Sequence, residues 1–487
     1  MGFAPAIAAT TYKVAVLRID FSDNAMTTTL SQTESLFSSF RGFYDENSYG
    51  VLTVTATLSS GGSGGHGALR MPRKHSYYAA GIFTAYDLLA EDALEAAQNA
   101  GMDLSSYNHI VLYHAGQGAE TTHDGNIWSA YLPSGYINGP QVGDRNFEGL
   151  TVVPEAQGGG VHPLGVLCHE YGHQLGLPDL YNTSTGESSV GVWSLMDYGT
   201  YSGSPQGSNP SHLDAWSKQF LGFSSPETIT LSGGLARSLA QAETTRGAFL
   251  RVPIMNSPAG PDKEYFLVEY RRKSGAQYDR ELPGEGVLIW HVDDSVASNP
   301  ARLKSNSVNS GKPNHGVRLI PASSFGVASN GRDLWPQARS AAKFSSPKSN
   351  GLNGKNSGVE IENISAAGGP AISMTVKTYL NNAAFASNRA NGGVVIAGGE
   401  GGFVNPDRGE SAQIGLVPAN STSINIKILT VNGDLIAEKF AQGLGGNQSF
   451  VSWDGKDAQG NVVASGIYFV KIEGGGIDVV KKVAVVR

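Results

Sequence analysis

The stretch from His169 to Asp179 constrains the fold more than any other part of the chain. It reads His-Glu-Tyr-Gly-His-Gln-Leu-Gly-Leu-Pro-Asp. Residues four apart on an α-helix share one face, so His169 and His173 can present imidazole nitrogens to one metal ion. Apolar residues recur at three- and four-residue steps roughly opposite the two histidines, at Leu164, Leu167, Cys168, Tyr171 and Leu175. The sequence therefore predicts a helix with one face in a core and the other toward a cleft.

The sequence also predicts how this helix ends. Pro163 suits a first helical turn, Gly176 suits the left-handed residue past the last turn, and Pro178 prevents the helix from resuming. This reversal can bring Asp179 beneath the metal as a third ligand, with a fourth position left for water. Glu170 can accept a proton from that water as it attacks a carbonyl. These residues predict a zinc peptidase, and the alternative is an ordinary amphipathic helix with surface histidines.

The extended motif resembles the zinc motif of the metzincin clan of peptidases. The aspartate at the third-ligand place resembles the immune-inhibitor-A branch of that clan, peptidase family M6. Further segments are similar to the same branch, at Val14–Asp23, Trp193–Gly199, Glu264–Glu269 and Gly286–Asp293. The resemblance covers roughly residues 12–378.

The resemblance implies a role for each matching residue. The implied zinc ligands are His169, His173 and Asp179, the implied general base is Glu170, the methionine beneath the metal is Met196, and the oxyanion stabiliser is Tyr198. Plain packing under the helix is the alternative for Met196 and Tyr198. The implied reaction is hydrolysis of peptide bonds by a metal-activated water, with Glu170 taking the proton and returning it to the leaving amine. A carboxylate ligand makes that water less acidic than three imidazoles would, so Glu170 matters more.

Composition sets the wider frame. A chain of 487 residues is too long for one ordinary domain, and its 40% hydrophobic content is enough to form cores. The net charge of −7, from 35 basic and 42 acidic residues, argues against a nucleic-acid partner and against a polybasic membrane patch. No apolar run approaches the about 18 residues that span a bilayer. We expect a monomer that acts on protein or peptide substrates and has no integral membrane segment.

Cysteine use and the first residues bear on the compartment. Cys168 is the only cysteine, so the chain forms no intrachain disulfide and no cysteine-rich zinc site. Its position on the apolar stripe indicates a buried small side chain rather than a reactive thiol. The segment from Met1 to Ala6 lacks the charged and apolar regions of an intact signal peptide. Members of the family are usually secreted with a signal and a propeptide, so a secreted, extracellular bacterial protein is expected by resemblance only.

Changes in residue pattern divide the chain into three predicted domains. Residues 1–223 are expected to form an α/β, metzincin-like zinc peptidase domain. Residues 224–378 carry short strand patterns broken by Gly, Pro, Ser and Asn, typical of an all-β, sandwich-type accessory domain. Residues 379–402 are expected to form a linker, and residues 403–487 an immunoglobulin-like β-sandwich.

Several elements of the first domain can be predicted individually. Strands are expected at Tyr12–Phe21 and His109–His114, and a helix at Ala85–Ala100. The segment Ile127–Leu132 alternates bulky residues. It is expected to be either the edge strand above the cleft, where an extended substrate would pair through its backbone, or an ordinary internal strand.

The C-terminal part shows its own pattern. Ile424–Leu429 alternates in polarity, and Asn432-Gly433 is a strong tight-turn signal. With Trp453–Gly455 and Ser465–Phe469, this region resembles the immunoglobulin-like module of flagellar hook-capping proteins. Such a module carries no chemistry here. It could contact a cell surface or the secretion machinery, or add only stability.

Other hypotheses stay open. Relatives often bind Ca²⁺, and Asp20 with Asp23, or Asp293 with Asp294, could supply oxygen ligands. Neither pair has an EF-hand spacing, so no residues are assigned to calcium. A binding protein or adhesin with a vestigial metal site is a second function, against which the intact Glu170 argues. A zinc hydrolase of esters or glycans is a third, although the β-rich region lacks an evident aromatic platform.

Overall fold

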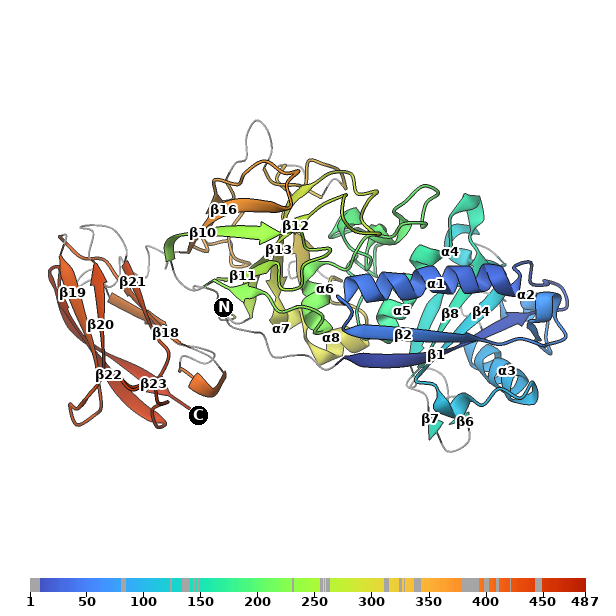
Figure 1. Cartoon of the computed structure of the whole chain (residues 1–487), viewed down its shortest axis with the longest axis horizontal. Coiled ribbons are helices and arrows are strands. Elements are labelled where there is room, and N and C mark those ends of the chain that lie inside the picture. Colours follow the sequence, from blue (N-terminus) through green and yellow to red (C-terminus); the bar gives the residue numbers. More distant parts are fainter. Residues whose placement is uncertain are drawn as a thin grey trace.

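The structure is a computed structural model of the chain. The residues that it describes are 9–79, 85–122, 125–133, 141–142, 145–146, 149–229, 232–254, 257, 259, 263–310, 315–323, 326–327, 329–336, 343–378, 394–397, 403–408, 411–420, 422–442 and 449–487. The fold is multidomain, strand-rich and mixed α/β, with several separate sheets (Figure 1).

A six-stranded sheet forms the N-terminal region. Its strands, in spatial order, are β2 (Leu52–Leu58), β1 (Thr10–Asp20), β4 (His109–Gln117), β8 (Gly149–Ala156) and β5 (Ala130–Pro133), with β3 (Leu69–Arg70) also paired to β1. All pairs are parallel except β5 with β8. Parallel strands need crossover connections, and helices supply most of them here. A short two-stranded sheet, β6 (Gln141–Val142) with β7 (Arg145–Asn146), lies between β5 and β8 in sequence.

Helices cover both faces of this sheet. The longer ones are α1 (Leu30–Asn47), α3 (Tyr86–Asn99) and α5 (Leu164–Gln174), and the shorter ones are α2 (His75–Tyr78), α4 (Ala119–Thr122) and α6 (Ala215–Phe220). Figure 1 shows α1 on one side of the strands and α3 on the other. Thr29 and Gln32 form a capping box that begins α1. The Tyr44 hydroxyl of α1 donates to the Cys168 carbonyl of α5 at 2.6 Å, which fixes these two helices to each other.

The β-rich region that follows contains two sheets. The first has the order β14 (Val317–Leu319), β13 (Gly286–Asp293), β12 (Glu264–Arg271), β11 (Phe249–Pro253) and β9 (Glu227–Thr228). The second has the order β10 (Ser232–Ala240), β16 (Ala371–Thr378) and β15 (Val359–Glu362). Two short helices, α7 (Asp294–Ala297) and α8 (Pro300–Lys304), follow β13.

Strands β12 and β13 of the five-stranded sheet are buried on both faces. Along β13, Leu288, Trp290 and Val292 belong to the same hydrophobic core as β1 and α5, whereas Val287 and Ile289 belong to the core that the β-rich region forms internally. The alternation follows from the two-residue period of a strand. The N-terminal sheet and the β-rich region therefore share one continuous core, and helix α6 lies where they meet.

The C-terminal unit has a hydrophobic core of its own. One of its sheets is β17 (Val394–Ala397), β18 (Ala412–Leu416) and β21 (Ser449–Trp453), and the other is β20 (Leu435–Gln442), β19 (Ser423–Leu429), β22 (Gly466–Gly474) and β23 (Ile477–Val485). Strand β17 lies inside the segment predicted to be a linker. Its residue Val394 is fully buried in this core, so this part of the segment belongs to the C-terminal unit. The other residues of that predicted linker, 379–393 and 398–402, lie outside the described residues.

The strands and helix predicted individually in the first region are present as β1, α3 and β4, within one or two residues of the expected bounds except at the end of β4. The predicted strand at Ile127–Leu132 is shorter, since β5 begins at Ala130, and it is an edge strand. Among the described residues, no helix combines the length and apolar content that crossing a bilayer requires.

Candidate metal centre

Helix α5 carries both predicted histidine ligands. Its apolar side is buried, with Leu167, Cys168 and Tyr171 fully inaccessible to solvent. On the other side, His169 Nδ1 lies 2.9 Å from the Leu195 carbonyl, and His173 Nδ1 lies 2.7 Å from the Leu177 carbonyl. A carbonyl can only accept, so each Nδ1 carries the proton. Nε2 is then the nitrogen of each ring that can bind a metal ion, and the ring is held by the backbone.

The end of α5 returns the chain toward the histidines. Gly176 has a φ of +102°, its N–H donates to the His173 carbonyl at 2.9 Å, and the Leu177 N–H donates to the Gly172 carbonyl at 3.0 Å. This pair of bonds is the Schellman arrangement, which a glycine adopts without strain. The predicted reversal is present, and it brings Asp179 back beneath the helix.

Three ligand atoms converge at this point. Asp179 Oδ1 lies 3.0 Å from His169 Nε2 and 3.3 Å from His173 Nε2. The ligand atoms of the three residues all lie within 4.8 Å of one another. Asp179 Oδ1 is buried, and besides these two Nε2 contacts it has no hydrogen-bond partner in the described part of the chain. Two imidazole nitrogens and one carboxylate oxygen suit Zn²⁺, and three protein ligands leave a coordination position open. These residues therefore fit a zinc ion.

The electrostatics of the metal-free site agree with a cation centre. Burial alone lowers the pKa of His173, but the Asp179 carboxylate outweighs that effect and raises it to about 9. Burial would raise the pKa of Asp179, yet the two imidazoles hold it well below its usual range. Burial raises the pKa of Glu170, which suits a group that must accept a proton. Without metal, protons supply the positive charge that a dication would bring.

Comparison with known proteins agrees with this geometry. Residues 143–225 match the immune inhibitor A peptidase M6 catalytic domain. The M6 resemblance predicted from the sequence is thereby confirmed, and the matched segment contains the three predicted ligands, Glu170, Met196 and Tyr198. Residues 404–476 match the FlgD Ig-like domain, which confirms the immunoglobulin-like resemblance of the C-terminal unit.

Individual relatives are similar over parts of their length. Immune inhibitor A of Bacillus thuringiensis subsp. alesti is 29% identical over 311 residues, which are 52% of this chain and 42% of that protein. The pre-pro-metalloprotease PrtV of Vibrio cholerae serotype O1 is 50% identical over 60 residues, 12% of this chain and 6% of that protein. The chain thus spans less than half the length of these relatives. Wild-type OgpA from Akkermansia muciniphila aligns over 99% of this chain and 95% of its own, at 11% identity and a TM-score of 0.28.

Within the M6 match, Met196 packs directly against the helix that carries the histidines. Its side chain is buried, and a Cβ added at Gly172 would lie 2.8 Å from Met196 Sδ. The turn around Met196 is pinned by Asp197, whose Oδ2 accepts from the N–H groups of Ser189, Val190 and Gly191. Gly172 therefore allows the methionine to lie close to the backbone of the helix between the two histidines.

We expect Gly172→Ala to destabilise the metal-free chain by about 1–3 kcal/mol, because the added methyl overpacks the methionine contact. The better helix propensity of alanine would offset up to about 1 kcal/mol of this. Denaturant unfolding of the metal-free protein measures the change. Adding Met196→Ala should recover part of the loss, so the two substitutions would be non-additive. Unchanged stability of the single variant would contradict the close contact.

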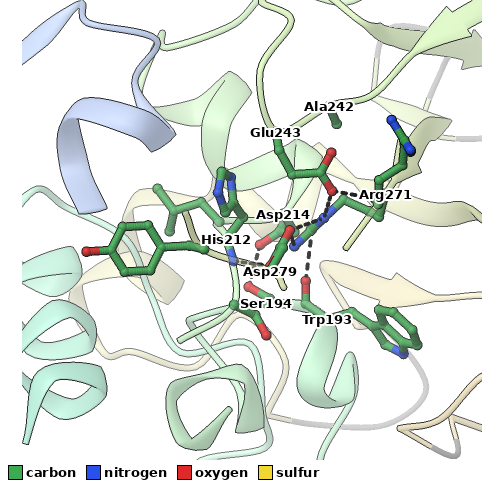
Figure 2. Close-up of polar contacts among 12 residues, drawn as sticks. Trp193, Ser194, His212, Asp214, Ala242, Glu243, Arg271 and Asp279 are labelled. Atoms are coloured by element: carbon green, nitrogen blue, oxygen red, sulfur yellow. Dashed lines mark hydrogen bonds and ion pairs between the residues drawn. The ribbon is translucent and has the colours of Figure 1, made fainter. Parts of the chain in front are cut away.

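The β-rich region contacts the turn around Met196 through a buried ionic network (Figure 2). Arg271 Nη1 donates to the Trp193 carbonyl at 3.2 Å, and Arg271 Nε donates to Asp279 Oδ2 at 2.7 Å. Asp279 Oδ1 accepts from the His212 N–H at 2.8 Å, and the His212 carbonyl accepts from the Leu195 N–H at 3.2 Å. The carbonyl of that same leucine holds His169, so Arg271 and Asp279 are linked to this predicted ligand through the backbone.

The hydroxyl of Tyr198, predicted to stabilise the oxyanion, is bonded to a backbone carbonyl in this structure. The side chain of Tyr198 is 47% exposed, and its hydroxyl donates to the Gly186 carbonyl at 3.3 Å.

Burial and the carboxylates of the site raise the pKa values of two other phenols, those of Tyr201 and Tyr181. Burial and the Glu120 and Glu170 carboxylates raise the pKa of Tyr201 to about 12, and burial with the Asp179 carboxylate raises that of Tyr181 further. Both phenols stay protonated near neutral pH and can act only as hydrogen-bond donors or neutral acceptors.

Two further residues near the site were missed by sequence reasoning. Glu120 accepts from the Ser129 N–H at 3.2 Å and from the Ser129 hydroxyl at 2.6 Å, and so fixes the chain just before edge strand β5. Asn306 bonds to Asp179 from the β-rich region. Neither lies in a motif, and no spacing in the sequence connects either of them to the histidines.

The acidic pairs considered for calcium are already occupied. Asp20 pairs with Arg70, and Asp23 accepts from the His75 N–H at 2.6 Å. Asp293 caps α7, and Asp294 accepts from the Tyr265 hydroxyl at 2.8 Å. Among the described residues, the one group of three or more His, Cys, Asp or Glu side chains that could hold a metal is the zinc group. The calcium hypothesis therefore stays without a site in that part of the chain.

Proposed function

We propose that this chain is a zinc-dependent endopeptidase that hydrolyses peptide bonds of proteins, with His169, His173 and Asp179 as the metal ligands. The observation that carries the proposal is the convergence of two imidazole Nε2 atoms on one buried carboxylate oxygen, with each ring held through its Nδ1 by a backbone carbonyl. The match of residues 143–225 to the M6 catalytic domain supports the same reaction class.

The chemistry divides between metal and protein. A zinc ion held by these three residues supplies Lewis-acid chemistry, which lowers the pKa of water and polarises a carbonyl. Glu170 acts as the general base: it follows a ligand directly on α5, its pKa is raised by burial, and it keeps partial exposure toward solvent. After taking the proton, the neutral Glu170 carboxyl delivers it to the amine of the leaving peptide.

Edge strand β5 supports extended binding of the substrate. Within the described sheet it pairs only with β8, and β8 is the strand that precedes α5. A peptide in extended conformation could add to this edge through main-chain hydrogen bonds. Glu120, which is bonded to Ser129, would keep the entry to this edge fixed.

The proposed donor to the oxyanion is the hydroxyl of Tyr198. Tyr198 keeps this role in the proposal on the condition that its hydroxyl leaves the Gly186 carbonyl when substrate binds. The finer features of the proposal rest on residue pattern and on family resemblance. Residue pattern gives the bounds of a metzincin-like catalytic domain over residues 1–223, an accessory domain over 224–378 and a C-terminal module over 403–487. Resemblance gives the metzincin-like fold, secretion, and contact of the C-terminal module with a surface or the export machinery.

The test is cleavage of unfolded casein by the purified full chain before and after removal of zinc. We expect a strong chelator to abolish cleavage and stoichiometric Zn²⁺ to restore it, because zinc is needed for both the nucleophile and the carbonyl. The expected loss is at least about 100-fold. Cleavage that continues in the metal-free chain would overturn the proposal. So would a zinc-loaded chain that cleaves no protein but hydrolyses an ester or glycan.

A further inference from the structure

Asp179 is held by a residue that lies far away in the sequence. The Asp179 N–H donates to Asn306 Oδ1 at 2.7 Å, and Asn306 Nδ2 donates to Asp179 Oδ2 at 2.6 Å. The first bond fixes the orientation of the amide, because a backbone N–H needs an acceptor and only Oδ1 is one. The amide NH₂ group must then face the carboxylate. Both polar groups of Asn306 are thus used on one residue, the third ligand.

Asn306 is itself placed by the backbone around it. It follows α8 and has a φ of +48°, a left-handed conformation that asparagine tolerates better than most residues. The segment after it runs beside the segment after Asp179. Thr183 Oγ1 donates to the Asn306 carbonyl at 3.0 Å, the Thr183 N–H donates to Ser310 Oγ at 2.9 Å, and Asn309 Nδ2 donates to the Leu180 carbonyl at 2.8 Å.

This arrangement divides the two carboxylate oxygens of Asp179 between two tasks. Oδ2 is bound to Asn306, while Oδ1 lies buried between the Nε2 atoms of the two imidazoles. A carboxylate restrained through one oxygen presents the other at a fixed angle, so little freedom is lost when a metal binds. A neutral amide donor also leaves the negative charge of the carboxylate in place for the cation.

We propose that Asn306 is a positioning residue for the metal site, which holds Asp179 as a one-oxygen ligand and makes the β-rich region part of the metal centre. The inference rests on the proposed function, because it assigns Asp179 as a zinc ligand. It goes beyond that function in stating that residues outside the M6 match, which ends at residue 225, complete the site.

The test measures metal affinity rather than catalysis. Zinc affinity of the full chain is determined by competition with a chromogenic chelator at pH 7, for the wild type and for Asn306→Gly. Glycine keeps the left-handed backbone without strain and removes the amide. We expect Asn306→Gly to bind zinc about 10–100-fold more weakly. The absorption spectrum of the Co²⁺-substituted chain should change as well, since the angle of the carboxylate ligand is no longer fixed.

Two further variants separate positioning from folding. Asn306→Asp keeps an acceptor for the Asp179 N–H and tolerates the left-handed conformation, but it replaces the donor by a second carboxylate. It should bind zinc more weakly than the wild type and with an altered cobalt spectrum. Ser310→Ala is the matched control, because Ser310 joins the same two segments through Thr183 without contacting Asp179. Its zinc affinity and cobalt spectrum should stay those of the wild type.

The outcomes are distinguishable. Wild-type affinity and spectrum in both Asn306 variants would overturn the inference, as would an equal loss of affinity in Ser310→Ala, which would mean that docking of the segment alone matters. A wild-type chain that binds zinc and shows this pattern but cleaves no peptide would contradict the proposed function and support the positioning role. A wild-type chain that binds no zinc would overturn both.

Discussion

Replacing Glu170 by glutamine should lower the rate of casein cleavage by about 10²–10⁴-fold, the range that a positioned general base contributes. Glutamine has nearly the same shape and keeps the helix, but it cannot accept a proton. The three proposed metal ligands are other residues, so the zinc content should remain that of the wild type. Rates and metal content measured on the same preparations test both halves of this expectation.

The matched control for this variant is Glu95→Gln. Glu95 is also a helical glutamate, but it is exposed on α3 and belongs to no part of the metal centre, so cleavage should continue at the wild-type rate. If Glu170→Gln retained full activity with zinc bound, another group would have to serve as the base. Loss of zinc together with loss of activity would instead indicate that Glu170 supports the site structurally.

The local geometry of the site could be predicted from the sequence because it depends on short-range rules. The four-residue spacing of His169 and His173 follows from the helical repeat, and the reversal follows from the left-handed conformation that glycine favours at Gly176. The opposite apolar face could be read from spacing in the same way. Cys168 is buried on that face as expected, and burial raises the pKa of its thiol well above the usual value.

The supports of the site could not be predicted, because they join residues that the sequence does not relate. Asn306 lies 127 residues after Asp179, and Arg271 lies 78 residues after Trp193. Which asparagine or arginine comes to lie beneath a turn depends on how β12, β13 and α8 pack against α5 and α6. The position of the Tyr198 hydroxyl could not be predicted either, because sequence spacing does not show that it donates to the Gly186 carbonyl.

The relation between the first two regions was also beyond sequence reasoning. Strand patterns after residue 223 indicated a change of character, and the two sheets there agree with that. Yet every residue of β12 and of β13 is buried, so these two strands of the five-stranded sheet have no solvent face. Its inward side chains complete the core of the N-terminal region, and its charged ones support the turn that holds His169. Folding of the metal centre should therefore depend on both regions.

Replacing Arg271 by methionine should lower the free energy of unfolding of the metal-free chain by about 3–5 kcal/mol. Arg271 is 1% exposed and faces three carboxylates that are themselves buried, those of Glu243, Glu269 and Asp279. Methionine fills much of the volume but leaves Lys218 as the one cation that acts on these negative charges among the described residues. Burial already raises the pKa of Glu269 to about 7, and loss of the arginine would raise it further.

The sign of the pH dependence follows from that shift. A carboxyl group whose pKa is higher in the folded than in the unfolded chain contributes most stability below its unfolded pKa, near 4.3, and loses it as pH rises through the folded pKa. The stability difference between Arg271→Met and the wild type should therefore be larger at pH 8 than at pH 5. Denaturant unfolding at both pH values, with metal removed so that zinc binding adds nothing, measures it.

Arg237→Met is the matched control for the loss of an arginine. Arg237 pairs with Glu227 at 2.6 Å, but both side chains reach solvent, with 27% and 49% exposed. An exposed ion pair contributes only about 0–1 kcal/mol, so this variant should unfold nearly as the wild type does at both pH values. If Arg271→Met were equally mild, the network would be neutralised by protons or water rather than by the guanidinium. A large loss confined to Arg271→Met would instead identify the arginine as the cation that joins the β-rich region to the turn beneath the metal.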